Sequence, residues 1–208
     1  MAENLEERIK DIVEKNRNDL AEKVLERKTE LLDDDDSHQE IYRVLGVPAE
    51  ECAEIDLYQN VGRFVYTYAG TMMEDVTRVL IESKDGGGPK SIPNTVSQNP
   101  ANFEIDSVTP DGRAHEIKWR DATTDGDHIR KEANKVESIL ASDLTPVRVM
   151  YFMPVRSAAH RIQLKVIEEF ERVGEAYVGE KAWDYVEERS GVDLKALLST
   201  LAGPHPDW

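Results

Sequence analysis

The sequence predicts an α/β protein with α+β character: a mixed central sheet that carries a β-hairpin, helices around that sheet, and a helical N-terminal third. Residues 4–32 repeat apolar side chains at helical spacing. Residues 103–119 alternate apolar and charged side chains on both sides of a turn sequence. A nearly continuous apolar segment at 147–153 has the character of a strand buried on both faces. Together these three patterns predict the fold class.

The N-terminal part of the chain predicts helices. The helix over 4–32 ends at the acidic run 33–36, and Ser37 is expected to cap a short helix in 38–46. A longer helix is expected over 56–82, and the glycine- and proline-rich residues 86–95 are expected to form a loop. We therefore expect a single domain, 1–208, with a helical N-terminal region, 1–55, and a core, 56–208.

The turn sequence TPDGR (109–113) fixes the register of the hairpin. Pro110 and Asp111 suit the centre of a type I turn, and Gly112 suits the left-handed position of a three-residue loop. A four-residue turn would shift the register by one residue and place Asp106 on the apolar face. The three-residue loop gives these pairs, counted outward from the turn: Thr109 with Arg113, Asp106 with Glu116, Ile105 with Ile117, Glu104 with Lys118, and Phe103 with Trp119. One face of the hairpin is then apolar, and the other is charged.

The C-terminal half continues with helices around one further strand. A helix over 126–141, capped by Thr124 or Asp125, precedes the buried strand at 147–153. An amphipathic helix is expected over 157–179, and two short helices over 180–191 and 192–201. Because a helix joins the hairpin to the third strand, the sheet is expected to be mixed, with helices packed against it.

The charged face of the hairpin suggests a metal site. Cross-strand partners have Cβ atoms roughly 4.5–5.5 Å apart, and like charges at that distance are destabilising. Asp106 and Glu116 would be held at this separation, which suits a divalent cation such as Mg²⁺ with the Ile117 carbonyl as a further ligand. Lys118 could then stabilise a phosphate or orient an attacking water. The alternative is an ordinary hairpin with one dry and one wet face, which does not explain the pairing.

Composition limits the classes of function. The 208 residues carry a net charge of −16, and no apolar run is long enough for a membrane span. Cys52 is the only cysteine, and the first residues have no secretory pattern, so we expect a cytoplasmic protein with no membrane partner. The charge is uneven: residues 1–60 are net −10, whereas residues 113–165 are net +3. A basic surface for nucleic acid is one interpretation, and an ordinary fluctuation in an acidic protein is the other.

The spacing of the acidic residues resembles a nuclease motif. Asp106, then Glu116, one spacer and Lys118 resemble the D…(D/E)-x-K motif of the PD-(D/E)xK nucleases, although Ile105 stands where proline is usual. Further segments, within about 100–201, look like the ApaLI-type restriction endonucleases: HEIKWRDATTDGDHIRKE (115–132), RSAAHRIQ (156–163), YVGEKAWDYV (177–186) and SGVDLKALL (190–198). The resemblance implies a restriction-endonuclease-like fold and a Mg²⁺-dependent homodimer that cuts double-stranded DNA at a short palindrome. The ends would be a 5′-phosphate and a 3′-hydroxyl, and a close match would imply the palindrome GTGCAC.

The resemblance also assigns roles to residues. Asp106 and Glu116 become metal ligands, and Lys118 becomes the catalytic lysine. An acid on the helix before the first strand often completes the metal site in this superfamily, and Glu74 and Asp75, with Glu82 behind them, occupy that place. Glu104 is interpreted as the ion-pair partner of Lys118.

The candidates for DNA contacts form two sets. Basic side chains of the positive block are candidates for phosphate contacts, and polar side chains of two loops are candidates for reading base edges. The candidates are Arg113, Arg120, Arg130, Lys131 and Lys135 for phosphates, and Asn94, Gln98, Asn99, Thr123, Thr124, Asp125, Asp127 and His128 for bases. His115, near the turn, is interpreted as structural.

Two other functions remain open at this point. One is a repair or recombination nuclease of the same fold. The other is a non-enzymatic acidic protein that binds a partner through its helices, an interpretation that the acidic N-terminal region supports.

Overall fold

The protein is described by a computed structural model that covers residues 2–120, 126–155 and 158–204, without the side chains of 2–4, 126–128 and 158–159. The chain divides into two compact units. The helical unit comprises Lys10–Met72 and the residues from Ala202 onward, and the sheet unit comprises Met73–Leu201 and the residues up to Ile9. The single domain and its internal boundary at residue 55 stay predictions.

The first three helices are α1, Ala2–Glu30; α2, Gln39–Val44; and α3, Ala49–Ile81. Both predicted long helices are confirmed, although α3 begins at Ala49 rather than at 56. Within the helical unit the Lys23 ammonium lies 5.9 Å from the centre of the Phe64 ring, and the side chains of Val13 and Val24 are buried. None of the helices in the described part of the chain is long and apolar enough to cross a membrane.

The start of α2 differs from the prediction. His38 rather than Ser37 occupies the N-cap position, and no side chain caps this helix. The backbone N–H of Ser37 donates to the Asp35 carboxylate at 2.9 Å, so the acidic run forms its own turn before the helix begins. The predicted role of Ser37 as a cap is therefore wrong.

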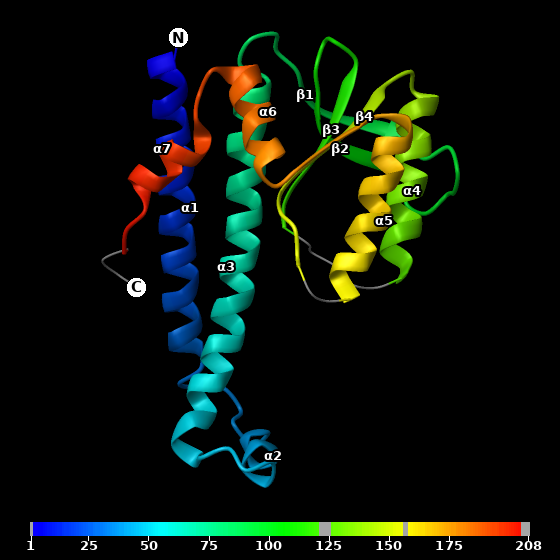
Figure 1. Ribbon diagram of the computed structural model, residues 1–208. Helices are drawn as coiled ribbons and strands as arrows, with labels where there is room; N and C mark the ends of the chain where they lie inside the picture. The colour runs from blue at the N-terminus through cyan, green and yellow to red at the C-terminus, as the bar shows by residue number, and fades with distance from the viewer. Residues whose placement is uncertain (1, 121–125, 156–157, 205–208) are drawn as a thin grey trace. The chain divides into compact units, whose positions relative to one another are not determined.

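The sheet unit contains one mixed sheet of five strands in the order β1-β2-β3-β4-β5. Figure 1 labels β1 to β4. The strands are Gly88–Pro93, Asn102–Val108, Arg113–Arg120, Thr145–Phe152 and Glu175–Val178. The first three strands pair antiparallel, and β3, β4 and β5 pair parallel. The predicted mixed sheet, with its hairpin and its buried strand β4, is confirmed.

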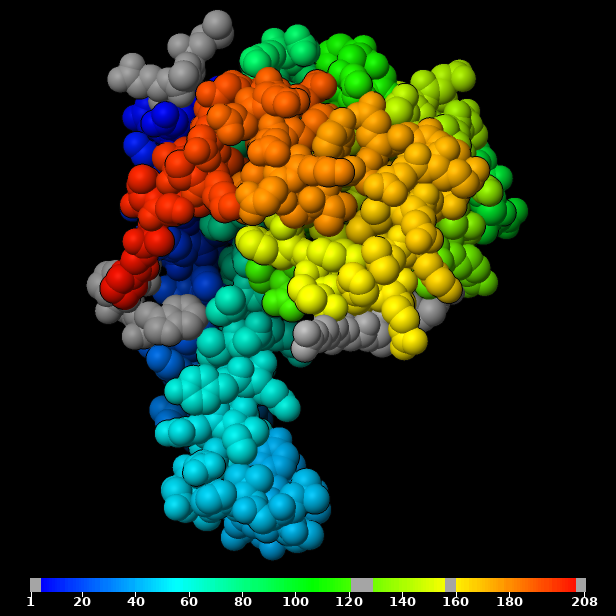
Figure 2. Space-filling model, viewed as in Figure 1, coloured from blue at the N-terminus to red at the C-terminus, as the bar shows by residue number. Residues whose placement is uncertain are grey.

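Helices cover both faces of this sheet, as neighbouring residues of β3 demonstrate. His115 hydrogen-bonds Tyr185 of α6, Glu180–Ser190, whereas Glu116 contacts Lys135 of α4, Gly126–Ala141. Because successive strand residues point to opposite faces, α6 and α4 lie on opposite sides of the sheet. α5, Ala158–Val173, packs beside α4 through Val136, Val166 and Phe170, and α7 spans Leu194–Leu201. In Figure 2 the chain from α5 to α6, coloured gold to orange, lies on the near surface of the sheet unit.

Two strands lie where the sequence predicted other structure. β1 lies within the predicted loop 86–95, and β5 lies within the predicted helix 157–179. α5 ends at Val173, and the next residue passes close to β4: a Cβ atom on Gly174 would fall 2.1 Å from the Pro146 carbonyl oxygen, so only glycine fits there. The short β5 then pairs with β4 and completes the parallel part of the sheet.

The hairpin turn is the one that the sequence predicts. The Gly112 N–H donates to the Thr109 carbonyl at 2.9 Å, and the Thr109 N–H donates to the Arg113 carbonyl at 3.0 Å. Gly112 has φ of +82°, the left-handed conformation that glycine adopts without a steric penalty. The two pairs nearest the turn, Ser107 with His115 and Val108 with Ala114, have the predicted register. The predicted pairs of 103–106 with 116–119 are wrong, because β2 and β3 do not pair beyond Ser107 and His115.

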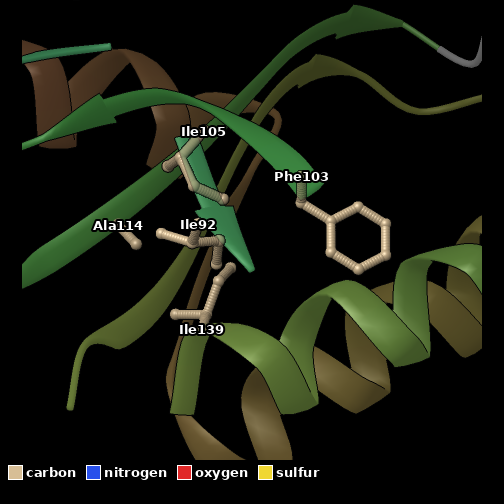
Figure 3. Close-up of a cluster of buried hydrophobic side chains, with 5 residues drawn as sticks. All are labelled: Ile92, Phe103, Ile105, Ala114 and Ile139. Carbon is tan, nitrogen blue, oxygen red and sulfur yellow. The ribbon is translucent and has the colours of Figure 1, made fainter. Parts of the chain in front are cut away.

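The single apolar face predicted for the hairpin is wrong. Phe103 and Ile105 pack with Ile92, Ala114 and Ile139, as Figure 3 shows. Ala114 shares its face of β3 with Glu116, so this cluster lies on the opposite face from Ile117. The alternation of β2 changes at a bulge, where Asp106 and Ser107 together lie opposite the single residue Pro89. Proline has no N–H to give to a ladder, which suits it to this position.

Candidate active site

The two strands of the hairpin separate at Asp106. Their regular pairing ends at Ser107 and His115, and beyond it the Ile117 N–H donates to the Asp106 carboxylate at 2.7 Å. A side chain thus takes the place of the backbone acceptor that a continuing ladder would supply. Asp106 is therefore held at the point where β2 and β3 part, beside Glu116.

Glu116 is the most deeply buried acid of the hairpin. Its side chain is only 1% exposed, and its Oε1 accepts a hydrogen bond of 2.7 Å from Lys135 of α4. The other oxygen, Oε2, is buried with no hydrogen-bond partner. A buried carboxylate oxygen without a donor is costly, so this atom is a place where a ligand would be stabilised.

The two partners of this ion pair respond differently to burial. Burial raises the pKa of Glu116, and the positive charge of Lys135 only partly opposes that rise. Burial works to lower the pKa of Lys135, but the adjacent carboxylate outweighs it and the pKa is raised. The buried Glu116 charge thus depends on nearby positive charge, from a lysine or from a bound cation.

Lys118 lies on the same strand, two residues beyond Glu116. Its Nζ is 3.7 Å from Oδ2 of Asp106, and the side chain is partly exposed. The predicted ion pair between Lys118 and Glu104 is wrong, because Glu104 is exposed and lies opposite Ser91 of β1. The structure therefore brings Asp106, Glu116 and Lys118 together, as the motif predicts.

Of the three acids proposed on the preceding helix, the structure links Glu74 to this group. Burial raises the pKa of Glu74, and the nearby negative charge of Asp106 raises it further while Lys118 opposes the rise. Asp75 instead forms an ion pair with Arg78 at 2.9 Å. Glu82 accepts a hydrogen bond of 2.6 Å from Ser107. These contacts give Asp75 and Glu82 structural roles.

The oxygen atoms of Asp106 and Glu116 suit a hard divalent cation. Among the residues that the structure describes, no three His, Cys, Asp or Glu side chains converge as a ready-made metal cage. Mg²⁺ usually binds through one or two carboxylates and keeps several waters, so two carboxylates with one unpartnered oxygen fit it better than a cage would.

The predicted phosphate contacts divide into two groups. Arg113 donates to Glu175 at 3.1 Å and to Asp111 at 2.7 Å, so its guanidinium stabilises the fold through ion pairs. Arg120 is exposed at the end of β3, with its guanidinium 5.4 Å from the centre of the Trp119 ring. Arg130 and Lys131 are exposed on the first turns of α4. Arg120, Arg130 and Lys131 therefore stay candidates for DNA contacts.

The predicted base-reading residues are only partly described. Thr123, Thr124 and Asp125 lie outside the described residues, as do the side chains of Asp127 and His128. Within the described loop 94–101, Asn94 uses its side chain to organise the loop. It accepts from the N–H groups of Val96 and Ser97, and it donates to the Pro100 carbonyl.

His115 is structural, as predicted. It is fully buried, and burial lowers its pKa to about 4, so the ring is neutral at pH 7. Its Nδ1 lies 3.3 Å from the Ser107 carbonyl oxygen, and its Nε2 lies 2.7 Å from the Tyr185 hydroxyl. In the neutral ring, Nδ1 therefore donates and Nε2 accepts.

Sequence reasoning missed a buried charge network behind Glu116. Arg148 of β4 is 1% exposed and donates to Glu132 of α4 at 3.1 Å. Lys135, predicted to contact phosphate, instead contacts Glu116. One signal was present in the sequence: Arg148 is the only charge in an otherwise apolar strand.

Comparison with known proteins identifies the family. No curated protein and no solved structure matches the chain. The family model of the ApaLI-like restriction endonucleases matches residues 1–203. The match thus extends beyond the C-terminal half, where the sequence resemblance was placed, into the N-terminal helices. The chain therefore belongs to the ApaLI-like restriction endonuclease family, whose members are DNA-cleaving hydrolases.

Proposed function

We propose that this protein is a type II restriction endonuclease of the PD-(D/E)xK kind, with Asp106, Glu116 and Lys118 as its catalytic residues. It hydrolyses a phosphodiester bond in each strand of a short palindrome in double-stranded DNA. The observation that carries the proposal is the position of Glu116 beside Asp106, with Oε2 buried and unpartnered where the strands part.

In this proposal Asp106 and Glu116 hold Mg²⁺, with the Ile117 carbonyl and Glu74 as further ligands. When bound, Mg²⁺ lowers the pKa of a coordinated water and neutralises charge on the phosphate. The protein contributes the fixed positions of its two carboxylates. Asp106 is held by the Ile117 N–H, and Glu116 is held by Lys135.

Lys118 completes the site as a partly exposed positive charge. Its Nζ lies 3.7 Å from Asp106, beyond a normal hydrogen bond, and its side chain reaches solvent. The ammonium can therefore turn from Asp106 toward the attacking water or a phosphate oxygen. There it stabilises negative charge that develops in the transition state.

Recognition of DNA is assigned to the part of the positive block at the end of β3 and the start of α4 rather than to the acidic helices. Arg120, Arg130 and Lys131 are exposed in this block and supply charge for phosphates. A palindromic site calls for two equivalent active sites, so we propose that a homodimer binds the DNA. GTGCAC is the palindrome that the family resemblance suggests.

Digestion of a sequenced plasmid with Mg²⁺, followed by mapping of the ends, tests this function. The wild-type protein should give discrete fragments that share one palindrome, with 5′-phosphate ends. Glu116→Gln and Lys118→Met should leave the plasmid uncut in the time that the wild type needs to digest it, whereas Lys165→Met, which changes an exposed lysine of α5, should cut normally. Random or structure-selective cutting would indicate a repair or recombination nuclease instead. Cutting by Glu116→Gln would contradict the assigned site.

A further inference from the structure

Lys135 contacts Glu116 from a separate element of the fold. Its Nζ donates to Glu116 Oε1 at 2.7 Å, and both side chains are largely shielded from water, at 16% and 1% exposed. Only one of the two carboxylate oxygens is used, and Oε2 stays buried without a partner. The contact therefore fixes the carboxylate and leaves one of its oxygens unpaired.

Lys135 also lies next to a second acid on its own helix. Glu132 precedes it by three residues, a spacing that places the two side chains on the same helix face. Glu132 is held by Arg148 at 3.1 Å, and its negative charge acts on both Lys135 and Glu116. The four side chains therefore form a buried row of alternating charge: Arg148, Glu132, Lys135 and Glu116.

This row is electrically balanced while no metal is bound. A divalent cation beside Glu116 would add two positive charges next to the Lys135 ammonium, and like charges repel strongly at low dielectric. Glu132 offers the ammonium another negative neighbour on the same helix face. The lysine could thus leave Glu116 without becoming a buried unpaired charge, which would be costly.

We propose that Lys135 is a positioning residue for Glu116 that acts as its counter-ion until a divalent cation binds. It holds Oε1 and so keeps Oε2 available, and it shifts toward Glu132 when the cation arrives. This inference rests on the proposed function, because it takes Glu116 as a metal ligand.

The first test measures whether Lys135 acts through Glu116. Thermal unfolding is followed in EDTA for the full-length wild type, Lys135→Gln, Lys135→Met, Glu116→Gln and the double variant Lys135→Met/Glu116→Gln. Lys135→Met leaves a buried carboxylate unpaired, so Tm should fall by about 6–20 °C. The double variant removes both charges and should recover most of this loss. Lys165→Met is the control and should not change Tm, because Lys165 is exposed on α5.

The second test uses a response that a merely structural ion pair would not change. Mg²⁺ is titrated into the wild type and into Lys135→Gln, which can still donate a hydrogen bond but carries no charge, and binding is measured by calorimetry. If Lys135 competes with the cation for Glu116, Lys135→Gln should bind Mg²⁺ about tenfold more tightly than the wild type. Lys165→Met should bind Mg²⁺ as the wild type does. Lys135→Gln also keeps the test decisive if Lys135→Met fails to fold.

The outcomes separate this inference from the proposed function. Tm losses that simply add in the double variant, or equal Mg²⁺ affinity in the wild type and Lys135→Gln, would overturn the role of Lys135 alone. Absence of Mg²⁺ binding in every protein would instead overturn the metal-dependent function, and with it the displacement of Lys135. Recovery in the double variant together with tighter Mg²⁺ binding by Lys135→Gln would support both.

Discussion

Two buried carboxylates, one in each unit, differ in whether the protein supplies hydrogen-bond donors to both of their oxygens. Asp56 of α3 accepts from the Tyr42 hydroxyl at 2.9 Å on one oxygen. Its other oxygen accepts from Gln39 at 3.0 Å and from His38 at 2.9 Å. Glu116 accepts from Lys135 on one oxygen only. Both oxygens of Asp56 are satisfied by the protein, whereas Glu116 retains an unused one.

The pKa values of these two acids shift in opposite directions, as their hydrogen bonding predicts. Burial works to raise the pKa of Asp56, but hydrogen bonds from Tyr42, Gln39 and His38 bring it below its ordinary value. Burial raises the pKa of Glu116, and Lys135 does not fully offset it. In the proposed function this difference separates a structural acid from a functional one: Asp56 links α2 to α3, while Glu116 keeps one oxygen for a ligand.

The largest effect on cleavage should come from removing the charge of Glu116, the acid with an unpartnered oxygen. Glu116→Gln keeps the size of the side chain but removes a ligand of the proposed metal, and metal-assisted stabilisation supplies several kcal/mol, so cleavage should fall by about 10³-fold or more. Initial rates of plasmid cleavage measure this loss. Asp56→Asn, the matched change in the satisfied acid, should leave the rate unchanged well below its unfolding temperature. Equal losses in the two variants would remove the distinction between the acids.

Lys118 should have the next largest effect. Lys118→Met removes a positive charge from the reacting phosphate, a loss of about 10²–10³-fold in rate. Because Lys118 is partly exposed, its removal should cost little stability, unlike that of Lys135. Cleavage rates and Tm are compared for the two lysine variants. A large loss of Tm in Lys118→Met, with its rate intact, would reverse the roles assigned to them.

The sequence predicted the part of the site that depends on local geometry. Residues Pro110 to Gly112 determine a turn, and the turn determines the register as far as Ser107 and His115. Asp106 lies just beyond this pairing, where its carboxylate accepts from the Ile117 N–H beside Glu116. Lys135 was assigned to phosphate because its partner is on a strand 19 residues away, and only the packing of α4 on the sheet joins them. The same holds for Arg148 and Glu132, whose contact is also between separate elements.

The parts of the fold that the sequence predicted wrongly also depend on contacts between separate elements. β1 begins at the last of three consecutive glycines and contains two prolines, a composition typical of a loop, and it becomes a strand by pairing with β2. β5 has only four residues and is defined by β4, its neighbour in the sheet. The bulge opposite Pro89 moved Phe103 and Ile105 to the other face, which a register counted from the turn cannot reveal.

Replacing Asp56, whose two oxygens both accept hydrogen bonds, should lower the stability of the protein. Asp56→Asn replaces a charge that accepts three hydrogen bonds with a group that has a single acceptor oxygen, so the free energy of unfolding should fall by about 1–2 kcal/mol. Urea denaturation measures the change. Asp19→Asn, at a partly exposed position of α1, is the control and should change stability by less than about 0.5 kcal/mol. An Asp56→Asn protein as stable as the wild type would show that the three hydrogen bonds do not fasten α2.

The smallest effect is a pH dependence of α2. Both ring nitrogens of His38 face acceptors, the Asp35 carbonyl at 3.1 Å and the Asp56 carboxylate at 2.9 Å, so the charged ring is favoured and its pKa is raised, chiefly by Asp56. The contribution of His38 is therefore complete below about pH 6.5 and is lost as pH rises through the raised value. The pKa of Asp56 is lowered, so its contribution is complete above about pH 4 and is lost at lower pH.

Hydrogen exchange of the α2 amides, corrected for intrinsic rates, should therefore show the greatest protection between about pH 4 and 6.5. Protection should decline only a little toward pH 8, because the His38 side chain is 50% exposed and solvent screens its pairing. His38→Gln retains a hydrogen-bond donor without a titrating charge, so it should remove the decline at high pH and leave the one at low pH. An unchanged profile in His38→Gln would mean that Tyr42 and Gln39 alone hold Asp56. The hydrogen bonds that Asp56 accepts would then not depend on pH above the pKa of Asp56.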